Sequence, residues 1–294
     1  MTDRTDITAV TAKASGILSD TGLPLHGFCP FSAVEGRLLP CRGLTRLRES
    51  FPPEAPARTV IAALFPYRFP DPAEGGQSNL SRYARVPDYH TAAGPVLAQA
   101  AERLAAVFPG ERFLPLIDNS PLPEVRAAAL AGLGVVGAHG LLIHPVYGSW
   151  VFIGAIVTGL ALGPSAVPEE PPSCPRCGKC AAACPGGCLS RTSGGAGGGR
   201  ETCLSALSQK KGELTGEEAR LLREYGVAWG CDACQEACPL NRNVRIDPHS
   251  CFGGRYEPRL TPASLEKLEG KAYGWRGKKV PLRNLSLTDG FTEF

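Results

Sequence analysis

The sequence predicts an α+β protein made of two domains and a basic tail. Residues 1–163 contain apolar runs typical of strands and a segment with helical periodicity. Nine of the twelve cysteines then fall between Cys174 and Cys238. A proline-rich stretch (GPSAVPEEPPS, residues 163–173) separates these two regions. We therefore expect domains at 1–163 and 164–242 and the tail at 243–294.

Four segments of the first domain have clear patterns. Residues 59–65 (TVIAALF) form a short, β-branched and apolar run, which predicts a buried strand. Residues 96–108 have the periodicity of a helix and are followed by a Pro-Gly pair that ends it. Residues 113–117 (FLPLI) predict a second strand, which Pro115 restricts to an edge or a bend. Residues 150–157 predict a further strand.

Asp118 lies between the strand at 113–117 and an expected helix that runs to about Ala131. Its position favours an N-terminal helix cap, because the positive end of the helix dipole stabilises an ionised carboxylate. The ends of strands are also where active sites of mixed α/β folds commonly lie. A proton donor at neutral pH needs a raised pKa, such as burial against a large cofactor provides. By position alone, we favour the cap and keep the proton donor as the alternative.

Two cysteine motifs in the second region predict two [4Fe–4S] clusters. A CxxCxxCxxxCP run begins at Cys174, and a lone Cys203 precedes a CxxCxxxCP run that begins at Cys231. In ferredoxin runs of this kind, the cysteine before proline binds the other cluster. The predicted ligands of cluster 1 are Cys174, Cys177, Cys180 and Cys238. Those of cluster 2 are Cys184, Cys203, Cys231 and Cys234.

Two alternatives to this assignment remain open. Cys188 is also close in sequence to cluster 2, but we prefer Cys203, which opens a segment (CLSALSQKKG) with helical character. Structural zinc also uses CxxC pairs, but two runs that both end in Cys-Pro fit zinc poorly. Cys29, Cys41, Cys188 and Cys251 are left over, and we expect them to be buried as small apolar residues.

Composition and charge set broader bounds. The chain has 294 residues, of which 43% are hydrophobic, enough for a sizeable core. The polar N-terminus lacks a secretory signal, and the apolar stretch 141–160 reads as two strands and a turn rather than as a membrane span. Many cysteines without export indicate metal thiolates and a cytoplasmic location. The net charge is +3, and the excess of positive charge lies in the tail, where residues 241–294 carry ten Lys or Arg residues against six acids. Such a tail can contact nucleic acid, although charge alone favours a solvated face.

Several ordered segments resemble the epoxyqueuosine reductase family. The matching pieces are ARTVIAALFPY (57–67), SRYARVPDYH (81–90), DNSP (118–121), AGLGVVGAHGLLI (131–143), YGSWVFIGAIVT (147–158), the cysteine run, CLSALSQKKGELT and GCDACQEACPLN. Together they cover roughly residues 20–242. The chain departs from the family at Ala138, where a lysine is usual, and at Leu240, where an aromatic residue is usual. Most of the family's C-terminal extension is also missing, so this is a shortened member.

The resemblance implies a fold, a reaction and a set of site residues. The first domain is expected to have a nitroreductase-like core that binds cobalamin, and the second to be a ferredoxin-like domain that passes electrons to the cobalt. The reaction removes the epoxide oxygen of epoxyqueuosine in tRNA, with Asp118 as proton donor and Asp88 as a second acid. This role for Asp118 replaces the cap that its position favours. The implied cobalamin contacts are Ser81, Tyr89, His90, His139, Leu142, Gly148, Ser149 and Ile153.

The implied partners are tRNA and an external low-potential electron donor. Two alternatives to epoxyqueuosine reduction are kept. The same machinery can serve a corrinoid reductase with another small substrate, for instance in reductive dehalogenation, which Ala138 and the short tail favour. The chain can also be a ferredoxin-type electron carrier or an activator of another corrinoid protein. The sequence does not indicate an oligomeric state.

Overall fold

A four-stranded antiparallel sheet forms the centre of the first domain. The computed structural model describes residues 4–71, 78–189 and 199–289. The strand order is β1-β2-β6-β3, and every neighbouring pair is antiparallel. The strands are β1 (His26–Pro30), β2 (Thr59–Pro66), β3 (Phe113–Leu116) and β6 (Val151–Thr158). A separate two-stranded sheet pairs β4 (Val135–Val136) with β5 (Leu142–Ile143).

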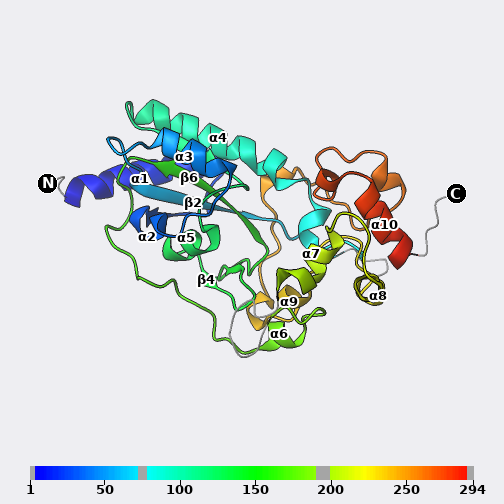
Figure 1. Cartoon of the computed structure of the whole chain (residues 1–294). Coiled ribbons are helices and arrows are strands. Elements are labelled where there is room, and N and C mark those ends of the chain that lie inside the picture. The colour runs from blue at the N-terminus through cyan, green and yellow to red at the C-terminus, as the bar shows by residue number, and fades with distance from the viewer. Residues whose placement is uncertain (1–3, 72–77, 190–198, 290–294) are drawn as a thin grey trace.

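Helices cover both faces of this sheet (Figure 1). On one face, α1 (Arg4–Asp20) and α4 (Tyr89–Val107) pack against side chains of β2 that include Ile61 and Phe65. On the other face, α2 (Ser32–Glu35), α3 (Arg42–Ser50) and α5 (Glu124–Leu130) cover side chains that include Val60. Because β2 is covered on both faces, all its residues are buried, and its sequence reads as one continuous apolar run.

The cysteine-rich region folds as a set of short helices beside the sheet domain. These are α6 (Lys179–Ala182), α7 (Leu204–Ser208), α8 (Gly216–Glu224) and α9 (Ala233–Glu236). The segment after residue 242 ends in α10 (Lys279–Thr288), which packs against α7 and α8 (Figure 1). The buried residues Leu260, Tyr273 and Leu285 of the segment after residue 242 share one core with Leu80 and Trp229. Residues 243–289 therefore fold onto both preceding regions. None of the described helices is both long and apolar enough to span a bilayer.

Most of the predicted elements are confirmed. Residues 59–65 form β2 with one further residue, and 150–157 correspond to β6. The stretch 141–160 contains two strands, as expected. Residues 113–117 form β3, an edge strand, which explains how Pro115 is tolerated without a backbone N–H. Helix α4 begins earlier than predicted, at Tyr89, because the Asp88 side chain accepts a hydrogen bond from the backbone N–H of His90 and caps it.

The helix cap that position alone favours for Asp118 is wrong. Asp118 and Asn119 both have positive φ angles, 45° and 42°, so the chain turns sharply after β3 instead of entering a helix. Helix α5 begins only at Glu124, with Pro123 in the capping position. The carboxylate of Asp118 is consequently not committed to a helix end and can serve another partner.

Candidate active site and cluster sites

Two aspartates bracket one histidine at the beginning of α4. His90 Nε2 lies 2.8 Å from Asp118 Oδ2, and His90 Nδ1 lies 2.5 Å from Asp88 Oδ1. The side chains of His90 and Asp118 are 41% and 59% exposed, whereas that of Asp88 is only 16% exposed. The structure thus brings together Asp88 and Asp118, the two predicted acids, and links them through His90.

The electrostatics of this group place a proton on the histidine. Hydrogen bonds first to Asp118 and then to Asp88 raise the pKa of His90 to about 9. The hydrogen bond from His90 in turn holds the pKa of Asp118 below its usual range. For Asp88, burial opposes ionisation, but the contact with His90 still lowers the pKa. At neutral pH the arrangement is therefore a carboxylate beside an imidazolium, and the available proton is on His90.

The backbone around Asp118 is tightly packed from one side. Glycine and asparagine tolerate the left-handed region best, and an aspartate there is uncommon. Gly43 of α3 lies directly beneath the turn, because a Cβ on Gly43 would stand 2.4 Å from the carbonyl oxygen of Asn119. The thiol of Cys41 donates a hydrogen bond of 3.2 Å to the same oxygen. Helix α3 and its preceding residue thus support the loop that carries Asp118.

Glu124 is a site residue that the sequence analysis missed. Burial, and then the charge of Asp118, raise the pKa of Glu124 to about 7. Its Oε1 is buried and has no hydrogen-bond partner among the described residues. An acid in the first turn of a helix ordinarily indicates only a favourable dipole interaction, so nothing in the sequence distinguished it. The signal lies in its burial next to Asp118, which only the fold provides.

A flat aromatic surface adjoins the acid group. The ring of Tyr89 stacks on Phe152 with centroids 4.4 Å apart and planes within 4°. Tyr89 also contacts His90, at 4.2 Å between ring centroids, and its hydroxyl hydrogen-bonds to Asp118. The first three residues of β6, Val151–Ile153, are only partly buried, unlike the rest of the strand. The start of β6 and the start of α4 therefore offer open surface next to Asp118.

Cluster 1's four predicted ligands surround one cavity. Its volume is about 230 Å³, and its lining includes Cys174, Cys177, Cys180 and Cys238. The cysteine from the second run thus joins three from the first, as the crossed assignment predicts. A zinc ion sits about 2.3 Å from each sulfur ligand, so a cavity of this size suits a multi-atom cluster better. The backbone N–H of Ala138 donates a hydrogen bond of 3.2 Å to Cys174 Sγ.

Cluster 2's four predicted ligands also lie near one another. Burial raises the pKa of Cys231 to about 11, and the neighbouring Asp232, Cys203 and Cys184 contribute further. Cys234 behaves in the same way, with a pKa of about 12. Cys188, the alternative ligand, is also present, since its Sγ lies 3.3 Å from Cys184 Sγ. Five thiols therefore lie at the proposed site of cluster 2, whereas a [4Fe–4S] cluster requires four.

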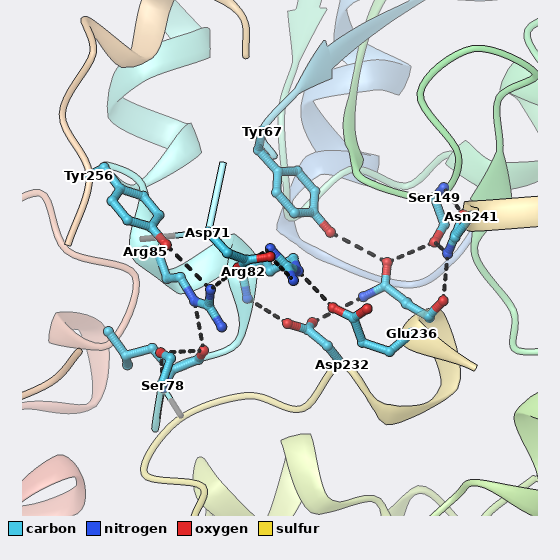
Figure 2. Close-up of polar contacts among 12 residues, drawn as sticks. Tyr67, Asp71, Ser78, Arg82, Arg85, Ser149, Asp232, Glu236, Asn241 and Tyr256 are labelled. Carbon is cyan, nitrogen blue, oxygen red and sulfur yellow. Dashed lines mark hydrogen bonds and ion pairs between the residues drawn. The ribbon is translucent and has the colours of Figure 1, made fainter. Parts of the chain in front are cut away.

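Polar contacts, of which those among Ser149, Gln235 and Asn241 are buried, join the sheet domain to the cluster region (Figure 2). Ser149 Oγ donates a hydrogen bond to Gln235 Oε1, and Asn241 Nδ2 donates one to Ser149 Oγ, both of 2.8 Å. The backbone N–H of Arg82 donates to Asp232 Oδ2 at 2.6 Å, and the Arg82 guanidinium pairs with Glu236 at 2.7 Å. These contacts fix the residues between and beside the cluster cysteines against β6 and the segment before α4.

The residues expected to contact cobalamin fall into separate places. Tyr89, His90 and Ile153 lie at the open surface beside Asp118 or at the start of β6. Gly148 and Ser149 pack against Asn241 at the domain junction. His139 lines the cluster 1 cavity, and burial lowers its pKa to about 4. The side chains of Leu142 and Ser81 are buried, at 2% and 4% exposure. Those two can meet a cofactor only through their backbone or after rearrangement.

Comparison with known proteins connects these sites to a family. Residues 51–119 match the family described as epoxyqueuosine reductase QueG, and residues 173–241 match a 4Fe-4S double cluster binding domain. An epoxyqueuosine reductase of Lactococcus garvieae is 30% identical over 252 residues, which are 78% of this chain and 68% of that protein. This chain belongs to the epoxyqueuosine reductase family. The family resemblance inferred from the sequence is therefore confirmed, as is the presence of a double [4Fe–4S] domain.

Other epoxyqueuosine reductases show the same likeness. One of Listeria monocytogenes is 34% identical over 67% of this chain, and one of Gloeobacter violaceus is 37% identical over 63%. The matched regions span only 53% and 56% of those two relatives.

Solved epoxyqueuosine reductases share the fold. The Streptococcus thermophilus structure has a TM-score of 0.72 at 23% identity, covering 94% of this chain and 80% of that one. A structure with an epoxyqueuosine-modified tRNA stem loop has a TM-score of 0.75 at 22% identity, covering 96% and 81%. A Bacillus subtilis structure, with a TM-score of 0.75 at 21% identity over 96% and 81%, has its catalytic aspartate loop swung out of the active site. The mixed helix and sheet architecture of this chain is thus that of the epoxyqueuosine reductases.

Proposed function

We propose that this chain reduces epoxyqueuosine to queuosine in tRNA, with Asp118 delivering the proton to the departing epoxide oxygen. The contact that carries the proposal is the 2.8 Å pair between Asp118 and His90 at the open end of the sheet. Opening a strained C–O bond requires electrons and an acid for the oxygen. The family membership supports the reaction, and the double cluster domain supports the supply of electrons.

The proton path follows from the pKa values. Asp118 is ionised at neutral pH, so it is not itself a stored acid. His90 is protonated up to about pH 9 and contacts Asp118 directly. Asp118 therefore passes a proton that His90 holds, and Asp88 keeps His90 charged and correctly oriented. Glu124, with a pKa of about 7 next to Asp118, is placed to add a second proton to the group.

The cobalamin site fits the open surface beside this group. The partly buried start of β6 and the stacked pair Tyr89–Phe152 offer the flat apolar area that a corrin ring requires. Among the described residues, Trp150 Nε1 and Arg68 Nε are buried donors without a hydrogen-bond partner. Amide groups at the rim of a corrin are suitable acceptors for such donors. Bound cobalamin supplies the reduced cobalt that this family requires, on what we infer to be a nitroreductase-like core.

Electrons are proposed to enter at cluster 2 from an external low-potential donor. Cys231 lines a cavity of about 640 Å³ that also contains Arg82, Arg85 and Asp232. Cluster 1, by contrast, adjoins Ala138 and His139 of the sheet domain. This difference supports an order in which cluster 2 faces the donor and cluster 1 faces the catalytic domain. We take the ferredoxin-like ligand sets predicted from the sequence as the proposed ligands of both clusters.

Complementation of a queuosine-deficient bacterial strain is the deciding experiment. Expression of this chain is expected to restore queuosine, measured by mass spectrometry of nucleosides from digested tRNA. In parallel, the purified and reconstituted protein is expected to take up cobalamin, measured by its visible absorbance after gel filtration. Protein that binds no cobalamin contradicts the proposal. Protein that binds cobalamin but restores no queuosine contradicts the proposed substrate. That result supports the alternative, a corrinoid reductase that acts on another small molecule.

A further inference from the structure

Cys188 is a buried thiol in direct contact with cluster 2's proposed ligands. Its side chain is 8% exposed, and its Sγ lies 3.3 Å from Cys184 Sγ. A [4Fe–4S] cubane takes four cysteine thiolates, one on each iron. Cys184, Cys203, Cys231 and Cys234 already supply four. One thiol of the five is therefore surplus to ligation, and it stands at hydrogen-bond distance from a ligand sulfur.

The local backbone holds Cys188 in this place. The chain turns immediately after Cys184, where the backbone N–H of Gly187 donates a hydrogen bond of 3.1 Å to the Cys184 carbonyl oxygen. Gly187 has a φ of +62°, which a side chain would oppose. Gly186 lies against Thr202, because a Cβ there would stand 1.7 Å from the Thr202 carbonyl oxygen. The turn is thus packed against the residue before Cys203, which leaves Cys188 little freedom to move away from cluster 2.

Cys203 is kept as the fourth ligand of cluster 2, as in the proposed ligand set. Cys203 and Cys184 are both neighbours of Cys231 and Cys234. Cys188 contacts this set through Cys184, with 3.3 Å between the two Sγ atoms, and it also interacts with Cys203.

We propose that Cys188 remains a thiol and donates an S–H···S hydrogen bond to the Cys184 ligand, which raises the reduction potential of cluster 2 above the value it would have without this bond. Reduction adds one negative charge to the cluster, part of which resides on the ligand sulfurs. A donor aimed at such a sulfur stabilises the reduced state more than the oxidised state, and hydrogen bonds to cluster sulfurs are a known determinant of potential. Cluster 2 therefore takes up an electron more readily than it would without Cys188.

The inference rests on the proposed cluster ligands but not on the proposed substrate. It is tested by reconstituting the protein anaerobically and titrating it with dithionite, while electron paramagnetic resonance follows each cluster. Cys188→Ala is expected to keep the full iron content, about eight irons for two cubanes. Its cluster 2 potential is expected to be more negative than in the wild type, with cluster 1 unchanged. Cys231→Ser, which alters one ligand, identifies the cluster 2 signal.

Cys188→Ser is the matched control, because its hydroxyl retains a donor in a side chain of similar size. It is expected to have a cluster 2 potential closer to the wild type than that of the alanine variant. An unchanged cluster 2 potential in Cys188→Ala overturns the proposal. Loss of about half the iron in Cys188→Ala also overturns it, because Cys188 would then be a ligand. Neither measurement uses tRNA or cobalamin, so a failure of the proposed reaction leaves this test intact.

Discussion

At the scale of single residues, His90 supplies the proton that an ionised Asp118 lacks. A carboxylate with a lowered pKa is a poor proton donor at neutral pH. Asp118 is such a carboxylate, but it lies against an imidazolium whose pKa is about 9. Because the two side chains are 2.8 Å apart, a proton can pass from His90 to Asp118 through a single hydrogen bond. We therefore propose the pair, and not either residue alone, as the proton donor.

Replacing Asp118 by asparagine is the clearest test of its role. Asparagine tolerates the positive φ of this position, so the turn is expected to keep its shape. The amide cannot relay a proton as the carboxylate does, and we expect single-turnover reduction of epoxyqueuosine to fall by about 10²- to 10⁴-fold. Iron content and cluster absorbance should be unchanged. Asp20→Asn, at an exposed position outside the site, is the control. Wild-type turnover in Asp118→Asn would refute the proton role.

The pH dependence tests His90. Its pKa is raised from about 6.5 in the unfolded chain to about 9 in the fold, so it carries a proton throughout neutral pH and loses it as pH rises through about 9. We expect the single-turnover rate to be constant around neutrality and to fall along that alkaline limb. Asp88→Asn removes one of the two charges that raise this pKa, so the limb should move to lower pH. A limb at the same pH in both proteins would show that His90 is not the titrating group.

Sequence reasoning named Asp88 and Asp118 as the acids, but it did not predict that His90 lies between them. Both acids were reached through family resemblance, and the position of Asp118 by itself pointed to a helix cap. Whether a residue after a strand caps a helix depends on φ, and five residues lie between Asp118 and the start of α5. The role of Glu124 depends on burial against Asp118, which no local pattern encodes.

At the scale of elements, α3 supports the turn that carries Asp118. Gly43 permits this contact, since any side chain there meets the carbonyl oxygen of Asn119. Gly43→Ala is expected to push the turn away from His90 and to lower the single-turnover rate, with cluster content retained. The matched control is Gly36→Ala, because a Cβ at Gly36 has no atom within 4 Å. Equal rates in the two variants would exclude a supporting role for α3.

The sequence predicted best the elements whose local pattern alone determines their position, such as a strand that is buried on both faces. Strand β2 is covered on both faces, so its continuous apolar run predicts a buried strand without information on which elements pack against it. Pro115 could be assigned to an edge strand because the missing N–H allows little else. The start of α4 was missed because Gly94 and Pro95 suggest a break, whereas the cap at Asp88 holds the helix through them.

At the scale of the whole molecule, the segment after residue 242 completes the rim of the active site. The backbone N–H of Asp88 donates a hydrogen bond of 2.8 Å to the Gly270 carbonyl oxygen, and Pro87 pairs with Lys271. Charge alone had favoured a solvated tail. Before α10, the apolar residues of this segment follow no helical or strand period, because they lie in turns and short 3₁₀ helices, so its packing could not be predicted locally. Three basic residues of this segment, Arg255, Lys267 and Lys271, thereby lie near Asp88.

If the proposed function is right, two of these basic residues are candidates to bind the phosphates of a tRNA stem. Arg255 and Lys267 line a cavity of about 460 Å³ together with Pro87 and Thr91, on either side of Asp88. Both are exposed. Arg255→Glu combined with Lys267→Glu is expected to weaken tRNA binding, measured by fluorescence anisotropy. The slope of log affinity against log salt should become shallower by about one to two, since each phosphate contact contributes a little under one.

The control for this prediction carries the same change in charge elsewhere. Arg48 and Arg103 are exposed residues of α3 and α4 that do not line this cavity. Arg48→Glu combined with Arg103→Glu lowers the net charge equally, so it reproduces any loss caused by the overall field of the protein. If the two double variants lose affinity to the same extent, phosphate binding is not localised at the rim beside Asp88. A loss confined to the Arg255 and Lys267 variant shows that the segment after residue 242 takes part in tRNA binding. The tRNA would then be held beside Asp88 and close to Asp118.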